Sequence, residues 1–444
     1  MPNSVAFNED YPVITTSDAL YERALKVMTP VTQTLAKGPG QYVNGVAPKY
    51  LKKGKGARVW DVDGNEYLDY NMAIGPVSLG YCYDKVDDAI KTQLQDGITF
   101  SMMHELEVVF AELINRVIPN AEAIRISKTG ADVTSAAVRL ARAYTGRSKV
   151  LCCGYHGWHD WYISVTSRNA GIPDDIADLT YTFDYNDIDS VKSVLDSDVA
   201  CVILEPFVFE APKDNFLHEL KALCEENGSL LIFDEMWTGF RIALGGAQEY
   251  FNIKPDLACY SKAFANGMPI SLLAGRKEIM QLFNEHVFFF TTFGGEALSL
   301  AAAVATINEM IKYNVPAHLA RKGKLLKDGY NNIAAELNIS YTRCIGYDCR
   351  SMIVFDSSAG NPLLLKSYVQ QELIKKGILW SGFHNVSFSH TEEDIQYTLK
   401  AYREVLQLLK EAVADNSVEQ KLKGKAVEAV FRKVNAFNTK PLVR

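Results

Sequence analysis

The sequence predicts an α/β fold in which a large domain is built on a mostly parallel sheet and a smaller α+β domain accompanies it. Short apolar runs at residues 199–204, 230–233 and 256–260 are separated by stretches with helical periodicity. Runs that are apolar at nearly every position fit parallel strands buried on both faces. Strands that alternate with helices indicate βαβ units, and hence a parallel sheet.

Composition and charge narrow the class of protein. Of the 444 residues, 48% are hydrophobic and 22% are charged, as in ordinary globular chains. A formal net charge of −7 gives no basic surface for nucleic acid or anionic membranes. The eight cysteines form no Cys-x-x-Cys pair, and we expect them to be reduced. Without a membrane-spanning run or a secretion signal, we expect a cytoplasmic protein with no nucleic-acid and no membrane partner.

The change of pattern along the chain predicts two unequal domains. Residues 76–320 carry the alternating strands and helices of the large domain. From residue 321 to 444 the pattern changes to helices with short strands, which predicts a smaller C-terminal domain. Residues 1–75 are expected to contribute an N-terminal segment to that smaller domain.

The N-terminal segment contains a helix, a loop and a hairpin. Helical spacing begins near Thr15 and is stopped by Pro30, and residues 37–49 are rich in glycine and proline. Residues 58–69 predict a β-hairpin that turns on Asp63 and Gly64. Its acidic residues do not form a calcium loop, because glycine and glutamate are missing at the positions that such a loop requires.

The next stretch predicts a strand, a turn of small residues and a helix. Helical patterns at residues 86–94 and 106–117 precede a strand at 123–127 and a helix from about 133 to 144. The turn between strand and helix contains Thr129-Gly130-Ala131. Glycine lets the backbone approach a ligand closely, and free amides at a helix start favour phosphate. A plain connection without a ligand is the alternative interpretation.

An aromatic loop follows the strand predicted at residues 149–153. Residues 154–162 have the sequence Gly-Tyr-His-Gly-Trp-His-Asp-Trp-Tyr. Its two histidines lack a convincing third ligand, so no metal site is predicted. A ring stacked on a flat cofactor is the favoured interpretation of Tyr155, with a core aromatic as the alternative.

Two apolar runs end in residues that suit pyridoxal phosphate. The run at 230–233 ends in Asp234, and the run at 256–260 is followed by Ser261 and Lys262. Ligands bind at the carboxyl ends of parallel strands. A lysine can form a Schiff base with the aldehyde of this cofactor, while a carboxylate keeps the pyridine nitrogen protonated. The alternative is a capping aspartate and an ordinary surface lysine.

The remaining elements follow from the same patterns. A strand at 270–274 and an extended run at 288–292 precede an alanine-rich helix at 297–311. The C-terminal part predicts strands at 351–355 and near 378–380. A long helix at 392–414 has a capping box made by Thr391 and Asp394. The tail from residue 416 places apolar residues 427, 430, 431 and 434 at helical spacing, which predicts a docked helix.

Together these stretches resemble the class III aminotransferases of pyridoxal-phosphate fold type I. The branch that contains glutamate-1-semialdehyde 2,1-aminomutase is the most similar. The resemblance covers about residues 35–410. It is most specific at residues 231–241, Leu-Ile-Phe-Asp-Glu-Met-Trp-Thr-Gly-Phe-Arg, and at Ser261-Lys262 with the following Gly267-Met268-Pro269.

The resemblance implies roles for eight residues of this chain. Lys262 and Asp234 are the catalytic pair, Tyr155 and Met236 lie against the two faces of the cofactor ring, and the phosphate is bound by a turn. The residues of that turn are Thr129, Gly130 and Ala131. Thr292 matches a threonine that reaches the phosphate held by the neighbouring subunit, which implies a homodimer with active sites at the subunit interface.

Four departures from the family pattern stand out. Ala131 replaces a threonine, and Gly295-Glu296-Ala297 replaces Gly-Asn-Pro. The aminomutases carry an arginine for the substrate carboxylate near the N-terminus, whereas residues 42–48 contain none. Residues 377–390 lack the gating glutamate of those enzymes and offer His384 and Asn385 instead.

The expected activity is transfer of an amino group from a small-molecule amine donor to an aldehyde or ketone acceptor. Lys262 is expected to move the proton as general base and acid. Loss of a bidentate carboxylate partner favours a neutral, sugar-like acceptor, although Arg241 and Arg350 remain candidate partners for a carboxylate. The alternatives are the aminomutase itself and, in another class, a non-catalytic binding protein on the same fold.

Overall fold

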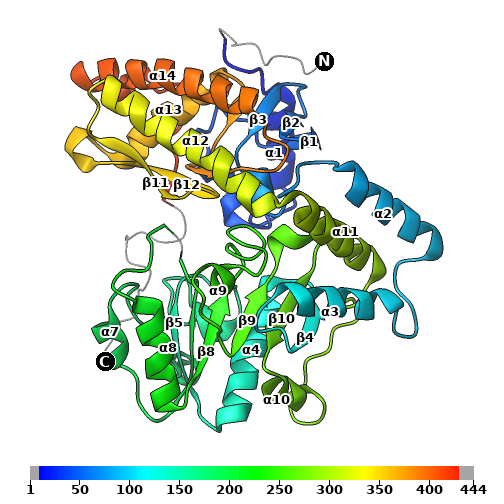
Figure 1. Ribbon diagram of the computed structural model, residues 1–444. Coiled ribbons are helices and arrows are strands. Elements are labelled where there is room, and N and C mark those ends of the chain that lie inside the picture. The colour runs from blue at the N-terminus through cyan, green and yellow to red at the C-terminus, as the bar shows by residue number, and fades with distance from the viewer. Residues whose placement is uncertain (1–9, 208, 430–444) are drawn as a thin grey trace. The chain divides into compact units, whose positions relative to one another are not determined.

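The computed structural model describes residues 10–207 and 209–429, and this part of the chain divides into two units (Figure 1). One unit contains the chain up to Tyr83 and again from His318, and the other contains Asp84–Ala317. The expected boundaries were residues 75/76 and 320/321. Residues 430–444 of the expected small domain lie outside the described residues.

The unit Asp84–Ala317, called the large unit below, is built on a seven-stranded sheet of order β4-β10-β9-β8-β7-β5-β6. The strands are β4 (Ala123–Ser127), β5 (Lys149–Cys153), β6 (Thr180–Thr182), β7 (Val199–Leu204), β8 (Leu230–Asp234), β9 (Leu257–Tyr260) and β10 (Ser271–Gly275). Strands β9, β8, β7, β5 and β6 pair in parallel, and β10 is antiparallel to both of its neighbours. The predicted α/β class with a mostly parallel sheet is therefore confirmed.

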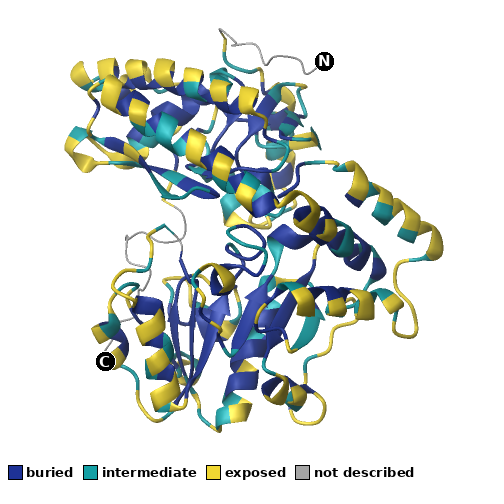
Figure 2. Cartoon of the chain, in the orientation of Figure 1, coloured by how far each residue is buried: buried dark blue, intermediate teal, exposed yellow. Residues whose placement is uncertain are grey.

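The central strands are buried along their whole length, as their apolar sequences predicted. Every residue of β7, β8 and β9 is buried, which Figure 2 shows as a dark sheet between helices that expose their outer faces. The three-residue edge strand β6 was missed, because Thr-Tyr-Thr is too short to give a pattern. Residues 288–292, which lead into the alanine-rich helix, lie in a loop.

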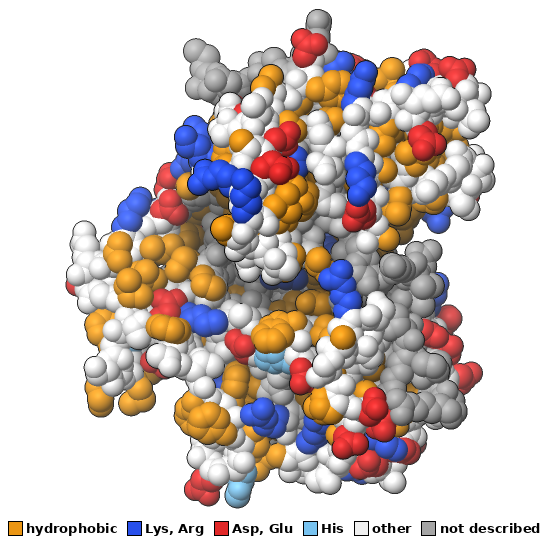
Figure 3. All heavy atoms as spheres, turned by 180° about the vertical axis from the view of Figure 1, so that it is seen from behind, with side chains coloured by type: hydrophobic (Ala, Val, Ile, Leu, Met, Phe, Trp, Pro, Cys, Tyr) orange, Lys and Arg blue, Asp and Glu red, His pale blue; other side chains and the backbone are white. Residues whose placement is uncertain are grey.

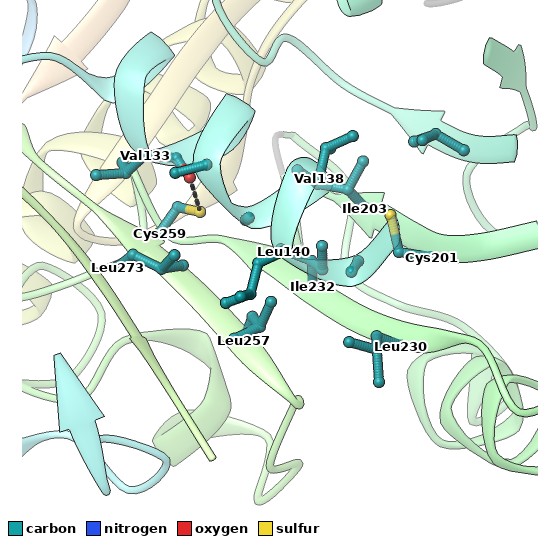
Figure 4. Close-up of a cluster of buried hydrophobic side chains, with 14 of the residues drawn as sticks. Val133, Val138, Leu140, Cys201, Ile203, Leu230, Ile232, Leu257, Cys259 and Leu273 are labelled. Carbon is teal, nitrogen blue, oxygen red and sulfur yellow. Dashed lines mark hydrogen bonds between the residues drawn. The ribbon is translucent and has the colours of Figure 1, made fainter. Parts of the chain in front are cut away.

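Helices of the large unit connect and cover the strands. They are α2 (Asp84–Asp96), α3 (Glu105–Val117), α4 (Gly130–Thr145), α5 (Asp160–Ile163), α6 (Asp174–Ala177), α7 (Ile188–Lys192), α8 (Phe216–Asn227), α9 (Ala247–Tyr250), α10 (Lys277–Met280) and α11 (Ala297–Tyr313). Helix α4 packs on the sheet, and Figure 4 shows its apolar side chains, among them Val133 and Leu140, facing those of the strands. The 3₁₀ turns η4 (Lys262–Ala265) and η5 (Gln281–Phe283) complete the unit.

The other unit, called the small unit below, contains two small sheets. One has the order β1-β2-β3-β13 and the other the order β11-β12-β14. The strands are β1 (Leu51–Lys55), β2 (Arg58–Asp61), β3 (Glu66–Asp69), β11 (Thr342–Tyr347), β12 (Arg350–Phe355), β13 (Ile378–Leu379) and β14 (Phe383–Asn385). Strands β2 and β3 form the predicted hairpin. Strand β3 also pairs in parallel with β13, which lies about 300 residues later in the chain.

The helices of the small unit include the predicted N-terminal and C-terminal ones. They are α1 (Thr15–Leu25), α12 (Val315–Glu336, whose first residues precede the unit), α13 (Pro362–Lys375), α14 (Glu392–Ala414) and α15 (Val418–Lys421), with 3₁₀ turns η1 (Leu35–Lys37), η2 (Pro39–Gln41), η3 (Met72–Ile74) and η6 (Ser357–Ala359). The capping box of α14 between Thr391 and Asp394 is present as predicted.

The predicted tail helix lies partly outside the described residues. Val427 lies in irregular chain, where its amide donates to Ser367 Oγ at 2.9 Å, and residues 430, 431 and 434 lie outside the described residues. Among the residues that the structure describes, no helix combines the length and apolar character needed to cross a membrane. No cluster of metal-ligating side chains occurs in the same residues.

Candidate active site

Asp234 lies at the carboxyl end of β8 and pairs with His156. The two side chains are buried, and a hydrogen bond of 2.8 Å joins His156 Nδ1 to Asp234 Oδ2. A carboxylate can only accept, so Nδ1 carries the proton of this bond. The other carboxylate oxygen accepts from the Met236 amide at 3.1 Å. Asp234 is thus held in one orientation from two sides.

His156 is itself fixed by its surroundings. Its ring stacks on Trp161 at a centroid distance of 6.0 Å and meets Tyr162 edge-on at 5.4 Å. Its backbone carbonyl accepts from Thr134 Oγ1 at 2.7 Å. Its second nitrogen, Nε2, is buried and has no hydrogen-bond partner among the described residues. The sequence raised His156 only as a metal ligand, and its contact with Asp234 was missed.

Lys262 follows β9 on the same edge of the sheet. Its backbone has a φ of +59°, a conformation that a residue with a side chain adopts rarely and only where its surroundings hold it. Its Nζ lies 3.9 Å from the centroid of the Trp237 ring, a cation–π contact. Trp237 follows Asp234 by three residues. The contact therefore brings the two predicted catalytic segments together, and the role of Trp237 was not anticipated.

The predicted phosphate turn opens helix α4. Thr129 caps the helix: its Oγ1 accepts from the Asp132 amide at 3.3 Å, and its own amide donates to Asp132 Oδ2 at 2.8 Å. This capping box starts the helix at Gly130, so the predicted start near residue 133 was wrong. The free amides and the positive end of the helix dipole at this point favour an anion.

Two glycines bring the turn against the other predicted residues. A Cβ added to Gly130 would lie 2.9 Å from Met236 Sδ, so the Met236 side chain rests on the turn. A Cβ added to Gly157, whose φ is +108°, would lie 2.7 Å from Ala131 Cβ. The aromatic loop therefore packs directly on the turn. A larger side chain at either glycine would separate these segments.

Tyr155 is half-exposed, and its backbone is held by Glu205. The Tyr155 amide donates to Glu205 Oε2 at 2.9 Å, and the ring meets Tyr162 edge-on at 5.5 Å. Glu205 is buried directly after β7. The sequence marked Glu205 only as a strand end, and nothing in its local pattern indicated that it would fix a residue 50 positions earlier.

Glu235, next to Asp234, is a structural carboxyl. It accepts from Thr238 Oγ1 and from the amides of Ala247 and Gln248, at 2.8 and 2.9 Å for the two amides. Burial raises the pKa of Glu235 to about 7, partly offset by these hydrogen bonds, and the charge of Asp234 raises it further. Glu235 therefore fixes the chain after β8 rather than serving a ligand.

The arginines proposed as carboxylate partners differ in setting. Arg241 is buried in the large unit, and its Nε donates to the Trp237 carbonyl at 3.1 Å, so it supports the segment that carries Trp237. Arg350 is at the start of β12 in the small unit, where its guanidinium lies 5.1 Å from the centroid of the Phe383 ring. The contacts of Arg241 give it a structural function.

His384 and Asn385, the residues in place of the gating glutamate, lie in the small unit. His384 Nε2 is 2.7 Å from Tyr402 Oη, and Nδ1 is 3.0 Å from Ser351 Oγ. Burial, with a smaller effect of His390, lowers the pKa of His384 to about 3. Asn385 is also buried and donates to the Asn71 carbonyl at 3.1 Å. His384 is therefore a neutral core histidine.

Thr292 is exposed on the loop before α11. Glu296, at the end of this loop, caps α11 and forms an ion pair of 2.7 Å with Lys128, the residue before the phosphate turn. The structure thus brings seven of the eight predicted residues into connected segments at one edge of the sheet. It places Thr292 apart from them, on a neighbouring loop.

These residues fit pyridoxal phosphate. The cofactor needs a buried carboxylate for its ring nitrogen, an amine for its aldehyde, and a cradle of amides for its phosphate. Asp234 with its hydrogen-bond partner His156 supplies the first, Lys262 the second, and the turn at Gly130 the third. All three belong to the large unit.

Comparison with known proteins agrees with this chemistry. The family described as "Aminotransferase class-III" matches residues 42–393. A relative, 3-aminobutyryl-CoA aminotransferase of Cloacimonas acidaminovorans, is 35% identical over 403 residues, covering 88% of this chain and 96% of the relative. Glutamate-1-semialdehyde 2,1-aminomutase of Francisella tularensis is 34% identical over 389 residues, covering 79% and 89% respectively.

Solved structures show the same fold. The FumI protein of Sphingopyxis sp. MTA144, in its PLP internal aldimine form, superposes with a TM-score of 0.83 at 29% sequence identity. The match covers 90% of this chain and 98% of that protein. A β-phenylalanine aminotransferase from Variovorax paradoxus superposes with a TM-score of 0.78 at 22% identity, covering 89% and 94%, which speaks for the fold alone.

Proposed function

The chain belongs to the class III aminotransferases, which makes it a pyridoxal-phosphate enzyme, and from this premise we propose which of its residues perform the transfer and on what kind of substrate. The proposed catalytic residues are Lys262 and Asp234. Thr129, Gly130, Ala131, Tyr155, Met236 and Thr292 are the proposed cofactor-binding residues. The observation that carries the proposal is the buried Asp234–His156 pair beside the turn at Gly130.

Each side chain has a physical task. The bound cofactor withdraws electrons from the carbon that carries the amino group. Lys262 would hold the cofactor, and its amine would take a proton from the carbon that carries the amino group and later return one. Asp234 keeps a proton on the ring nitrogen, because a buried anion favours the charged form of a neighbouring base. Met236 and Tyr155 orient the ring.

This assignment is tested by measuring the visible absorption of the cofactor during the first half-reaction. The purified protein is mixed with L-glutamate and no second substrate, and the visible cofactor band is followed. Its conversion to the band of the amino form of the cofactor is the expected result for a glutamate-dependent enzyme. In Lys262→Ala we expect the conversion to be slower by at least about 100-fold, since a positioned base contributes this much. Unchanged turnover in that variant would refute the role of Lys262.

For the acceptor, we propose a carbonyl compound without a free α-carboxylate. The supporting observations are the absence of arginine from residues 42–48 and the engagement of Arg241 by the Trp237 carbonyl. Two classes satisfy this condition: a sugar-like ketone or aldehyde, and a β-keto acyl thioester, the carbonyl counterpart of the 3-aminobutyryl-CoA named for the relative from Cloacimonas acidaminovorans. Assay of both classes, with L-glutamate as donor, distinguishes them.

The aminomutase is the second candidate, because relatives with that activity are 34% identical to this chain. An aminomutase converts glutamate-1-semialdehyde alone, whereas an aminotransferase needs a second substrate. Conversion of the single compound therefore decides between them. A non-catalytic binding function is not favoured, since such a protein has no need for both Asp234 and Lys262.

We also propose a homodimer. Exposed hydrophobic side chains gather on the large unit around α3 and the loop before α11, and the view from behind shows many such side chains on the flank of α2 and α3 (Figure 3). They are Ile98, Phe100, Met102, Met103, Val108, Val109, Phe288, Phe290 and Phe293. The Ala297 amide donates to the Ile98 carbonyl at 2.9 Å, so the two segments adjoin. A second copy covering this surface also accounts for the exposed Thr292.

Light scattering of the wild type and of Phe290→Asp tests the dimer. We expect the wild type at twice the mass of 49.5 kDa and the variant shifted toward the monomer. A monomeric wild type would overturn the proposal. A cytoplasmic setting is proposed as well, since all eight cysteines are free thiols, as expected in a reducing compartment.

A further inference from the structure

The loop of residues 288–296, called the threonine loop because it carries Thr292, is bonded to both sides of the phosphate turn. Arg125, on strand β4 before the turn, donates from Nε and Nη2 to the Phe289 carbonyl at 3.2 and 2.8 Å. Arg139, on helix α4 after the turn, donates to the Phe288 carbonyl at 2.9 Å. The strand before the turn and the helix after it are therefore both connected to one loop.

The third connection is the ion pair between Lys128 and Glu296. Nζ and Oε1 are 2.7 Å apart, and the two side chains are only 18% and 11% exposed. Glu296 also accepts from the amides of Leu298 and Ser299, which anchors the carboxylate to the start of α11. Burial raises the pKa of Glu296, but the bonds from Lys128 and Ser299 outweigh it and hold that pKa below its usual value. Glu296 therefore carries its negative charge at neutral pH.

The backbone of the threonine loop runs close against strand β4. A Cβ added to Gly294 would lie 3.1 Å from the Ile126 carbonyl oxygen, and Gly294 is buried. The guanidinium of Arg125 lies 4.4 Å from the centroid of the Phe290 ring. Such close packing leaves little room for the loop to move independently of the strand that leads into the turn.

Lys128 is the residue directly before Thr129, the first residue of the turn. A displacement of the turn when it closes on a phosphate moves the Lys128 backbone with it, and the partly buried ion pair resists separation from Glu296.

We propose that Lys128 and Glu296 are positioning residues that couple the phosphate turn to the threonine loop, so that cofactor phosphate bound at the turn orders the loop that presents Thr292. This inference rests on the proposed cofactor-binding roles of the turn and of Thr292. In a homodimer whose Thr292 serves the neighbouring phosphate, filling one site prepares the other. The two sites then bind pyridoxal phosphate with positive cooperativity.

Hydrogen–deuterium exchange of the full-length protein, stripped of cofactor and then reloaded with pyridoxal phosphate, tests the coupling. In the wild type we expect the cofactor to protect amides of both the turn and the threonine loop. In Glu296→Gln we expect the protection of the turn to remain. We expect the protection factors of the loop amides to fall by about 5-fold or more, because 5-fold is the lower end of the range over which one site typically changes another. Equal loop protection in wild type and variant overturns the proposal.

Two further variants separate coupling from general loosening. Glutamine at 296 still accepts from the α11 amides, so Glu296→Gln is expected to fold, and a melting curve checks this. Lys128→Arg keeps the ion pair and should retain loop protection, whereas Lys128→Met should lose it. Glu225→Gln, which removes the 2.6 Å pair with Lys221 on α8, is the matched control and should leave the exchange of the loop unchanged.

The results also distinguish the coupling from the proposed function. A wild type that neither develops the visible cofactor band nor protects the turn overturns the cofactor assignment, and the coupling with it. Protection of the turn without the loop overturns the coupling and leaves the function intact. In cofactor titrations, a Hill coefficient above 1 for the wild type and of 1 for Glu296→Gln supports transmission between subunits, and a coefficient of 1 for both overturns it.

Discussion

Two histidines of this protein are equally buried and differ in what they contact. His156, in the large unit, is bonded to the carboxylate of Asp234 at 2.8 Å. His384, in the small unit, is bonded to two neutral hydroxyls, those of Tyr402 and Ser351. The charge of the partner, and not burial, distinguishes a histidine at a reaction site from one in a packed core. Local sequence offered His384 in place of a gating glutamate and gave His156 no role, and only the contacts separate them.

The largest effect should follow from removing the carboxylate that gives His156 its function. Asp234→Asn keeps the shape of the side chain but cannot hold a proton on the cofactor nitrogen. We expect kcat/KM to fall by about 100-fold or more, the cost of removing one preorganised charge from a reaction site. Steady-state kinetics with a saturating donor measure this. A fall of less than about threefold would show that Asp234 does not contact the cofactor.

His156→Phe should have the next largest effect. It leaves Asp234 in place but removes its hydrogen-bond partner. We expect activity to fall about 10- to 100-fold, the usual cost of losing a residue that orients a functional side chain through a hydrogen bond. Cofactor affinity should weaken as well, as measured by titration of the stripped protein. His156→Asn, which can still donate to the carboxylate, should recover part of both losses; no recovery would contradict a positioning role.

His384→Phe is the matched substitution in the small unit. It leaves Tyr402 and Ser351 without their shared partner in the core, so we expect the free energy of unfolding to fall by about 1–3 kcal/mol. The activity of the folded fraction should stay close to that of the wild type. Denaturant titration together with kinetics at low temperature tests both statements, and a large loss of kcat without loss of stability would place His384 at the reaction site after all.

The smallest effect concerns pH. The lowered pKa of His384, about 3, means that the folded chain leaves this imidazole neutral while the unfolded chain protonates it below about pH 6.5. The stability contributed by neutral His384 is complete above pH 6.5 and declines as the pH falls toward 3, by about 1.4 kcal/mol per pH unit. The difference between wild type and His384→Phe should therefore shrink between pH 7 and pH 5. A constant difference would contradict the neutral state of His384.

The sequence predicted those parts of the site that depend on strand ends. Apolar runs before Asp234 and Lys262 identified two strands of one parallel sheet, and the small residues at 129–131 identified the turn that opens α4. These predictions rely on local periodicity and composition, which are visible in a single chain.

The contacts that support those residues could not be predicted in the same way. His156 reaches Asp234 across 78 positions, and Glu205 reaches the Tyr155 amide across 50. Such contacts depend on the order of strands in the sheet, which local patterns do not specify. The three-residue strands β6 and β14 were missed because they are too short to show a period. The environment of His384 comes from residues elsewhere in the chain, so local sequence did not indicate it.

The parallel pairing of β3 with β13 has a consequence for protein synthesis. Leu68 donates its amide to the Gly377 carbonyl at 2.8 Å, so β3 acquires its neighbour only after about 300 further residues have been made. At about 5–20 residues per second, a ribosome needs roughly 15–60 s to supply them. During that time residues 84–317 of the large unit are synthesised, while the hairpin of β2 and β3 has one edge uncovered. Nascent chains stalled before residue 377 should therefore depend on chaperones.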